Sequence, residues 1–267
     1  VRSSAASDVY KRQDTVYIRK LAIGEGRPKI CVPICGKNRE EILREAENMQ
    51  KLPADLIEWR ADWYEDVFDR EALQETLGAL RRSLGDKPLL FTFRSIQEGG
   101  EKAISPEQYL AVGQAVCESG QADGLDVELF MDGKVTKALI EAAHRQEMAV
   151  IASNHDFIKT PEKDEITRRL ILMDEMGADI LKIAVMPKAK ADVLELLTAT
   201  EEMGRLYTEK PVVTMSMGPM GLISRLAGET FGSAITFGAG EKASAPGQMP
   251  AEQLEKVLDA IHESMGE

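Results

Sequence analysis

A lysine within an apolar run is the residue whose type and position most directly suggest chemistry. Lys182 lies in Asp179–Val185 (DILKIAV). A buried ammonium group is costly, so the side chain must reach solvent, pair with a carboxylate or serve as a neutral amine. Taken alone, the residue favours a structural salt bridge to Glu58 or Asp126. The alternative is a desolvated amine that attacks a carbonyl carbon.

The position of one histidine favours the second interpretation. His155 comes two residues after Ser153, where the preceding apolar run ends. Beside an amine nucleophile, an imidazole can act as general base and acid near neutral pH. The other histidines, His144 and His262, lie among charged residues on helical stretches, where we expect surface roles.

Arginines follow three different apolar runs, at Arg60, Arg94 and Arg225. Guanidinium groups bind carboxylates bidentately, so together they predict a local site for an anionic substrate. The chain as a whole is acidic, with 45 Asp and Glu against 33 Lys and Arg and a net charge of −12. This balance argues against a nucleic-acid partner.

A glycine-rich segment near the C-terminus, Gly238–Gln248, predicts a mobile loop. If it folds over the site, Ser244 and Gln248 could bind substrate hydroxyls. We expect no metal, because no H-x-H, H-E-x-x-H or carboxylate cluster has metal-ligand spacing.

Short apolar runs alternate with amphipathic stretches along the chain, and parallel strands joined by crossover helices are typical of this pattern. The number of runs and the length favour a single (β/α)8 TIM barrel, of the α/β class. An open doubly wound sheet is the alternative, but the first run ends in ICGKNRE, without a G-x-G-x-x-G turn. The predicted strands are Lys29–Cys35, Asp55–Trp59, Pro88–Phe93, Gly124–Leu129, Met148–Ser153, Asp179–Val185, Pro211–Met215 and Ser233–Phe237.

Helix starts are predicted at Asn38, at Ser105-Pro106 and at Thr160-Pro161, and Gly177 is a predicted stop. Ala189–Tyr207 and Pro250–Ser264 also show helical periodicity, and Pro219–Ala227 is a shorter, weaker stretch. Thr15–Pro28 predicts a β-hairpin with its turn at Gly24 and Gly26, placed to close the bottom of the barrel.

Residues 1–15 are expected to be a non-native or disordered leader, and 16–267 one catalytic domain. The leader has no apolar core typical of a signal peptide. The cysteines, Cys31, Cys35 and Cys117, predict buried thiols in a reduced compartment. With no run near the ~20 apolar residues of a membrane span, we expect a cytoplasmic protein without a membrane partner.

Several motifs occur together and in order: LIEWRAD, FTFRSIQEGG, ASNHDF, ILKIAVMP, TMSMGPMGLISR and FGSAITFGAGEKASAPGQ. From about Lys20 to the C-terminus the chain resembles the type I 3-dehydroquinate dehydratases of the shikimate pathway. The resemblance implies a (β/α)8 barrel, a homodimer and syn dehydration of 3-dehydroquinate to 3-dehydroshikimate without cofactor or metal.

The resemblance also implies roles for individual residues. Lys182 would form a Schiff base, His155 would transfer protons, and Glu98 would orient or assist the histidine. The substrate would be bound by Arg225, which holds its carboxylate, and by Glu58, Arg60, Arg94, Ser244 and Gln248. The family often has a serine contact on the first strand, where this chain has Pro33, so that contact is not carried over.

Other functions remain open from the sequence. A class I aldolase shares the barrel, the strand-six lysine and the imine, but it breaks carbon–carbon bonds. A catalytically inactive barrel could bind sugar acids, although the set of Lys182, His155 and Glu98 speaks against it. The same dehydration also serves quinate degradation.

Overall fold

Eight parallel strands form a closed barrel in the computed structural model, which describes residues 14–241 and 243–266. The sheet order β10-β3-β4-β5-β6-β7-β8-β9 follows the chain. It closes where Val212 bridges Ser233 and the Ala234 N–H donates to the Val212 carbonyl at 2.8 Å. The predicted TIM barrel is thus confirmed over the open sheet. The strands are β3 Lys29–Ile34, β4 Leu56–Arg60, β5 Leu89–Thr92, β6 Gly124–Glu128, β7 Ala149–Asp156, β8 Ile180–Val185, β9 Val212–Ser216 and β10 Ile235–Phe237.

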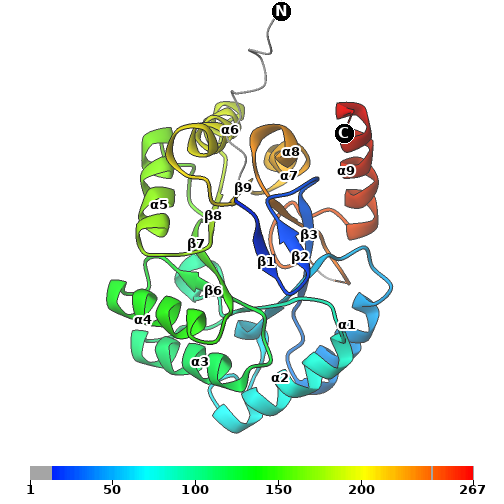
Figure 1. The fold of residues 1–267 in the computed structure, drawn as a ribbon, viewed down its shortest axis with the longest axis vertical. Coiled ribbons are helices and arrows are strands. Elements are labelled where there is room, and N and C mark those ends of the chain that lie inside the picture. Colours follow the sequence, from blue (N-terminus) through cyan, green and yellow to red (C-terminus); the bar gives the residue numbers. More distant parts are fainter. Residues whose placement is uncertain (1–13, 242, 267) are drawn as a thin grey trace, which may run out of the picture.

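Helices surround the strands (Figure 1). Short 3-10 turns η1, η2 and η4 follow β4, β5 and β9, and the π turn η3 extends α6 to Tyr207. The α-helices are α1 Arg39–Met49, α2 Arg70–Leu84, α3 Pro106–Ser119, α4 Gly133–His144, α5 Lys163–Glu175, α6 Lys190–Glu202, α7 Leu222–Leu226, α8 Gly228–Phe231 and α9 Ala251–Met265; the turns are η1 Ala61–Trp63, η2 Ile96–Glu98, η3 Met203–Tyr207 and η4 Pro219–Gly221.

The predicted helix starts are confirmed at two places and wrong at a third. Asn38 accepts a hydrogen bond from the Glu41 N–H, and Ser105 caps α3 ahead of Pro106. Helix α5 begins at Lys163 rather than after Thr160-Pro161. The reason is that the Glu195 carboxylate accepts the Lys163 N–H at 2.7 Å and so satisfies the first turn from another helix. The predicted stop holds, since Gly177 follows α5 with φ of 92°.

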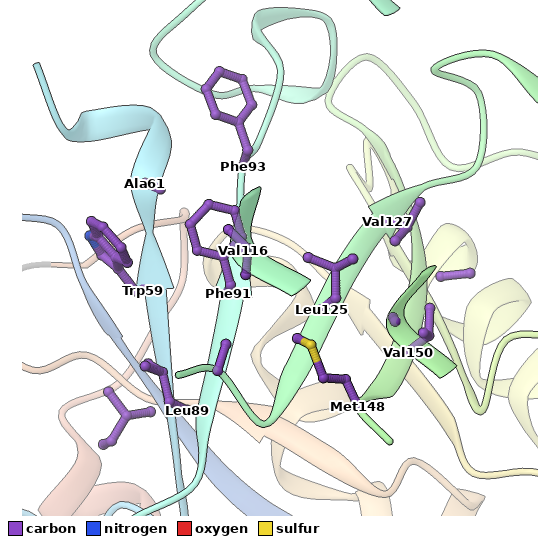
Figure 2. Packing of buried hydrophobic residues seen from close by; sticks show 14 of the residues in the cluster. Trp59, Ala61, Leu89, Phe91, Phe93, Val116, Leu125, Val127, Met148 and Val150 are labelled. Carbon is purple, nitrogen blue, oxygen red and sulfur yellow. The ribbon is translucent and has the colours of Figure 1, made fainter. Parts of the chain in front are cut away.

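Side chains alternate between the two faces of each strand, as they must in a pleated strand. One face packs against the helices, and on β4 and β5 it carries Trp59 and Phe91, whose rings meet edge to face with centroids 5.5 Å apart (Figure 2). The other face points into the barrel. On β8 the inward set is Ile180, Lys182 and Ala184, so the barrel interior changes from apolar to charged along one strand.

An antiparallel hairpin closes the N-terminal end of the barrel, as predicted. Strands β1 (Val16–Ile18) and β2 (Leu21–Ile23) place Ile18 and Ile23 in the same buried cluster as the inward residues of the barrel. The predicted turn is wrong. Ile18 pairs with Leu21, so the turn is Arg19-Lys20, and Arg19 has φ of 56°. The predicted turn residues Gly24 and Gly26 lie instead in the connection from β2 to β3.

The predicted leader falls mostly on residues 1–13, which lie outside the described residues. Its last residue, Thr15, donates a hydrogen bond to the Glu25 carboxylate at 2.6 Å. The three cysteines are buried and carry free thiols, as expected. Within residues 14–241 and 243–266, no helix is both long enough and apolar enough to cross a bilayer.

Candidate active site

An open cavity, with about 440 Å³ of space when the part open to solvent is included, lies at the C-terminal end of the barrel and brings together every residue that the sequence analysis assigned to a site. Apolar side chains, among them Phe157, Met215 and Phe237, complete its wall. The predicted residues in the lining are Glu58, Arg60, Arg94, Glu98, His155, Lys182, Arg225, Ser244 and Gln248.

A larger hollow of about 770 Å³ lies elsewhere, between the β2–β3 connection, the end of α6 and α8. Its charged side chains have partners within the protein, such as Asp259 for Arg27, Arg205 for Glu201 and His262 for Glu229. Neither a lysine nor a histidine lines it among the described residues. The smaller cavity is therefore the better candidate for catalysis.

Lys182 is only 4% exposed and its amine ends inside the cavity wall. Nζ donates to Asp126 Oδ2 at 3.2 Å, lies 3.9 Å from Glu58 Oε1, and stands 4.5 Å from the centre of the Phe237 ring. The structure confirms the predicted salt bridge, and Lys182 also lines the cavity. Arg94 and Lys182 outweigh the effect of burial and lower the pKa of Asp126, so this partner is ionised at neutral pH.

Glu98 holds His155 by two contacts to one carboxylate oxygen. Oε2 accepts the His155 backbone N–H at 2.9 Å and lies 3.0 Å from the imidazole Nδ1. The short turn η2 presents this carboxylate, and the glycines after it are required. A Cβ on Gly99 would lie 2.3 Å from the Phe157 ring, and one on Gly100 would lie 1.9 Å from a backbone oxygen.

Burial shifts the pKa values of Glu98 and His155 in opposite directions. Burial, helped by the nearby Glu128 and opposed by Arg94, raises the pKa of Glu98 to about 8. Burial and the positive charges of Arg94, Lys182 and Arg60 hold the pKa of His155 well below its usual range. The imidazole is thus neutral near neutral pH. With its Nδ1 directed at Glu98, its Nε2 is the nitrogen available to a substrate.

Arg94 lies in the cavity wall, but its guanidinium is occupied by the protein. It contacts Asp126 at 2.8 Å, Glu128 at 2.9 Å and Glu98 at 3.6 Å. Although burial opposes it, Asp126 and Glu128 raise the pKa of Arg94. Arg94 is therefore better placed to hold these three carboxylates together than to bind a substrate anion directly.

Arg60 and Arg225 differ in whether a carboxylate of the protein occupies the guanidinium group. Arg60 makes a bidentate pair with Asp62, at 2.8 Å for each contact. Arg225 has no carboxylate partner among the described residues, and burial lowers its pKa to about 10. Within the part of the chain that the structure describes, its guanidinium donates only to the Pro246 carbonyl at 3.1 Å and toward the Met215 sulfur at 3.6 Å. Arg225 is therefore the cation best placed to receive an anion.

The loop after β10 lies against the cavity, and its predicted residues bind each other. Gln248 Oε1 accepts the Ser244 N–H at 2.8 Å, and its Nε2 donates to Ser244 Oγ at 3.1 Å. Arg60 donates to the Ser244 carbonyl at 3.4 Å. These contacts bring hydroxyl and amide groups into the cavity wall.

Asp126 and Asn154 belong to the site although they were not assigned to it. Asn154 lies in the quoted motif ASNHDF, and Asp126 lies on the predicted strand Gly124–Leu129. A polar residue on a buried strand was the signal that could have identified both. Pro33, at the position of the family's serine, pairs with Glu58 in the sheet and is absent from the lining. Of the remaining histidines, His144 is 41% exposed and contacts Asp179, as expected. His262 is half-buried against Glu229.

Comparisons with known proteins agree with the fold and indicate a family. The family model "Type I 3-dehydroquinase" matches residues 30–265. A 3-dehydroquinate dehydratase of Bacillus licheniformis is 53% identical, with 94% of this chain and 98% of that protein covered. One from Clostridioides difficile is 51% identical, with 94% and 98% covered.

Solved structures agree as well. The type I enzyme from Clostridium difficile superposes with a TM-score of 0.92 at 50% identity, with 94% of this chain and 99% of that chain covered. The Geobacillus kaustophilus enzyme gives 0.91 at 38% identity, with 95% and 98% covered. The matched span includes all strands of the barrel and the cavity at its C-terminal end, and on these grounds the chain belongs to the type I 3-dehydroquinase family.

Proposed function

We propose that this 3-dehydroquinate dehydratase of the shikimate pathway works through a Schiff base on Lys182. The observation that carries the proposal is the content of one cavity. It holds a buried lysine amine, a neutral histidine and a buried arginine that lacks a carboxylate partner among the described residues. A nucleophile, a base and an anion-binding group are what dehydration of a keto acid requires.

The first step joins the enzyme to its substrate. The amine of Lys182 attacks the C3 carbonyl, and two protons of its ammonium form leave with the carbonyl oxygen as water, which gives a protonated imine. Asp126 accepts a hydrogen bond from Nζ at 3.2 Å and so directs the amine into the cavity. A description of the C. difficile relative supports a covalent site, since that protein is solved with covalently modified comenic acid.

The second step is elimination. The imine withdraws electrons from C2, and His155 removes a C2 proton to give an enamine. The enamine expels the C1 hydroxyl as His155 returns a proton to it, so one water is lost. Hydrolysis of the imine consumes another water and frees 3-dehydroshikimate. General acid–base catalysis contributes ~10²–10⁴-fold. One histidine serving both transfers gives syn geometry.

The side chains that line the cavity supply the contacts to the substrate. Arg225 holds the substrate carboxylate by a charge-assisted pair. Glu58, Arg60, Ser244 and Gln248 bind the hydroxyl groups, and Arg94 contributes by holding the carboxylate cluster in place. The scheme uses only protein side chains and needs no metal or cofactor.

The test is chemical trapping. Sodium borohydride added with 3-dehydroquinate should reduce the imine and leave a stable adduct on Lys182, found by peptide mass spectrometry. Lys182→Ala should show neither the adduct nor the ultraviolet absorbance of the conjugated product. An active enzyme without an adduct would refute the Schiff base. An aldolase would release two carbon fragments and no such absorbance, and an inactive binding protein would bind without turnover.

The proposal includes a cytoplasmic enzyme that assembles as a homodimer. Light scattering of the purified chain should give twice its 29.4 kDa mass, and a monomer would contradict the dimer. A quinate-degrading role uses the same reaction, so growth tests on quinate against growth without aromatic amino acids separate the two roles.

A further inference from the structure

Behind the catalytic pair, Asn154 connects Glu98 to the outside of the barrel. Its Nδ2 donates to Glu98 Oε1 at 3.0 Å, and its Oδ1 accepts from Arg169 Nη1 at 2.9 Å. Asn154 is 4% exposed. The carboxylate of Glu98 is therefore held on both oxygens, with Asn154 on one and His155 on the other.

Arg169 is itself held firmly on α5. Its Nε donates to Glu165 Oε1 at 2.7 Å, Nη1 lies 3.8 Å from Asp156, and the guanidinium carbon stands 5.6 Å from the centre of the Phe130 ring. The side chain is 15% exposed. These contacts hold the guanidinium beside the amide of Asn154.

The chemistry of these groups leaves one orientation for the amide. A guanidinium can only donate, so the Asn154 atom facing Arg169 must be the oxygen. The amide nitrogen must then face Glu98. In the flipped amide, a donor would face a donor and an acceptor would face a carboxylate, each at about 3 Å. Arg169 thus ensures that Asn154 donates to Glu98.

We propose that Arg169 and Asn154 are positioning residues that determine which imidazole nitrogen of His155 carries the proton. The donor from Asn154 favours the ionised form of Glu98. An ionised Glu98 must accept the proton of His155 Nδ1, which leaves Nε2 as a free base. Below the pKa of Glu98, about 8, the protonated carboxyl group donates to Nδ1, so Nε2 carries the proton and cannot act as the base. Without the Asn154 donor this pKa rises further, and the inactive arrangement persists to higher pH.

The surrounding charges do not perform this function themselves. Arg94 favours ionised Glu98 but is shared among carboxylates, and Glu128 disfavours it. The Asn154 hydrogen bond is one of the contributions that lower the pKa of Glu98. The titratable and charged groups that face the pair are Arg60 from β4, Arg94 after β5, Asp126 and Glu128 from β6, and Lys182 from β8, with Asp156, Glu165 and Arg169 beyond Asn154.

Adjacent arginines on α5 provide a matched control. Arg168 also binds Glu165, at 2.7 Å, but its only hydrogen bonds in the described structure are to that carboxylate. Arg169→Met and Arg168→Met each remove a partner of Glu165, and only the first releases Asn154. Asn154→Asp is a second, isosteric variant, which still accepts from Arg169 but has no donor for Glu98.

The experiment measures the tautomer of His155 and the pH profile of catalysis. The spectra are recorded above pH 8, where Glu98 of the wild type is ionised. Two-bond proton–nitrogen correlation spectra of histidine-labelled protein, assigned with His144 and His262 variants, should then show Nδ1–H in the wild type and Arg168→Met. Arg169→Met and Asn154→Asp should shift His155 toward Nε2–H. Their kcat should fall about 10–100-fold, within the range for impaired acid–base catalysis, and the acid limb of kcat/KM should move to higher pH. Arg169→Lys should restore part of the loss.

The inference rests on the proposed role of His155, and its failure is distinguishable from failure of the Schiff base. Borohydride trapping on Lys182 should succeed in all these variants, because imine formation does not need the Nε2 base. Arg169→Met and Asn154→Asp with the wild-type tautomer and acid limb would overturn the positioning role. A fall in kcat without a change in tautomer or pH profile would overturn it too, since a merely structural role predicts that result.

Discussion

The two ends of the barrel differ in what their inward side chains do, although the same strands form both. At the N-terminal end, Leu56, Leu90 and Ile180 pack beneath Ile18 and Ile23 of the hairpin. Two residues further along, β4 and β8 carry Glu58 and Lys182, and Arg94 follows the end of β5; all three are buried and charged. The apolar end supplies hydrophobic stabilisation, whereas the charged end keeps ionic groups out of water at a cost in desolvation. Stability and catalysis are thus assigned to different layers.

The largest expected effect tests the apolar end. Ile23→Ala should lower the free energy of unfolding by about 2–5 kcal/mol, because it leaves a cavity in a fully buried layer. At a temperature where the variant is folded, kcat should stay within about twofold of the wild type, since the catalytic layer is intact. Denaturant titration and steady-state kinetics measure both. A loss of kcat larger than the loss of stability would show that the two layers are coupled.

The next effect tests the charged end through its arginine without a carboxylate partner. Arg225→Met should raise KM by about 10–100-fold, which corresponds to the ~1.5–3 kcal/mol of a hydrogen bond to a charged group. The matched control is Arg27→Met at the other end, which loses the Asp259 pair and should leave KM unchanged. Equal KM values for Arg225→Met and the wild type would remove Arg225 from substrate binding.

The smallest effect is a pH dependence of stability. Because the pKa of Glu98 is raised from 4.5 to about 8, the native state binds more protons than the unfolded state in that window. Below pH 6.5 the lowered pKa of His155 has the opposite effect, so stability should fall mainly as pH rises from about 6.5 to 8. Glu98→Gln should flatten this fall, with the gain in Tm over wild type larger at pH 9 than at pH 5.

The same pair sets the acid limb of catalysis. First protonation of the Glu98–His155 pair removes the base, so the acid limb of kcat/KM in the wild type should lie between about 4.5 and 8. The lowered pKa of His155 alone excludes an ordinary histidine titration as its cause. An unchanged limb in Glu98→Gln would assign the limb to another group.

Local patterns predicted most of the framework. Apolar runs located all eight strands, and the caps at Asn38 and Ser105 were recognisable because their bonds lie within one turn. Errors occurred where a distant residue intervened. Glu195 moved the start of α5, and the hairpin turn lies at Arg19, whose guanidinium contacts Asp86 and Asp123. A pattern within a short window does not contain such partners.

The sequence by itself determined the barrel, the end that would carry chemistry and the residues in its cavity, because strand periodicity and order assign inward positions at each strand end. Only the tertiary structure decided how the charges are shared. It committed Arg94 to Asp126 and Glu128, left Arg225 without a carboxylate partner among the described residues, and joined Arg169 to Glu98 through Asn154. Partner choice among buried charges depends on distances of a few ångströms between strands, and sequence spacing does not specify those distances.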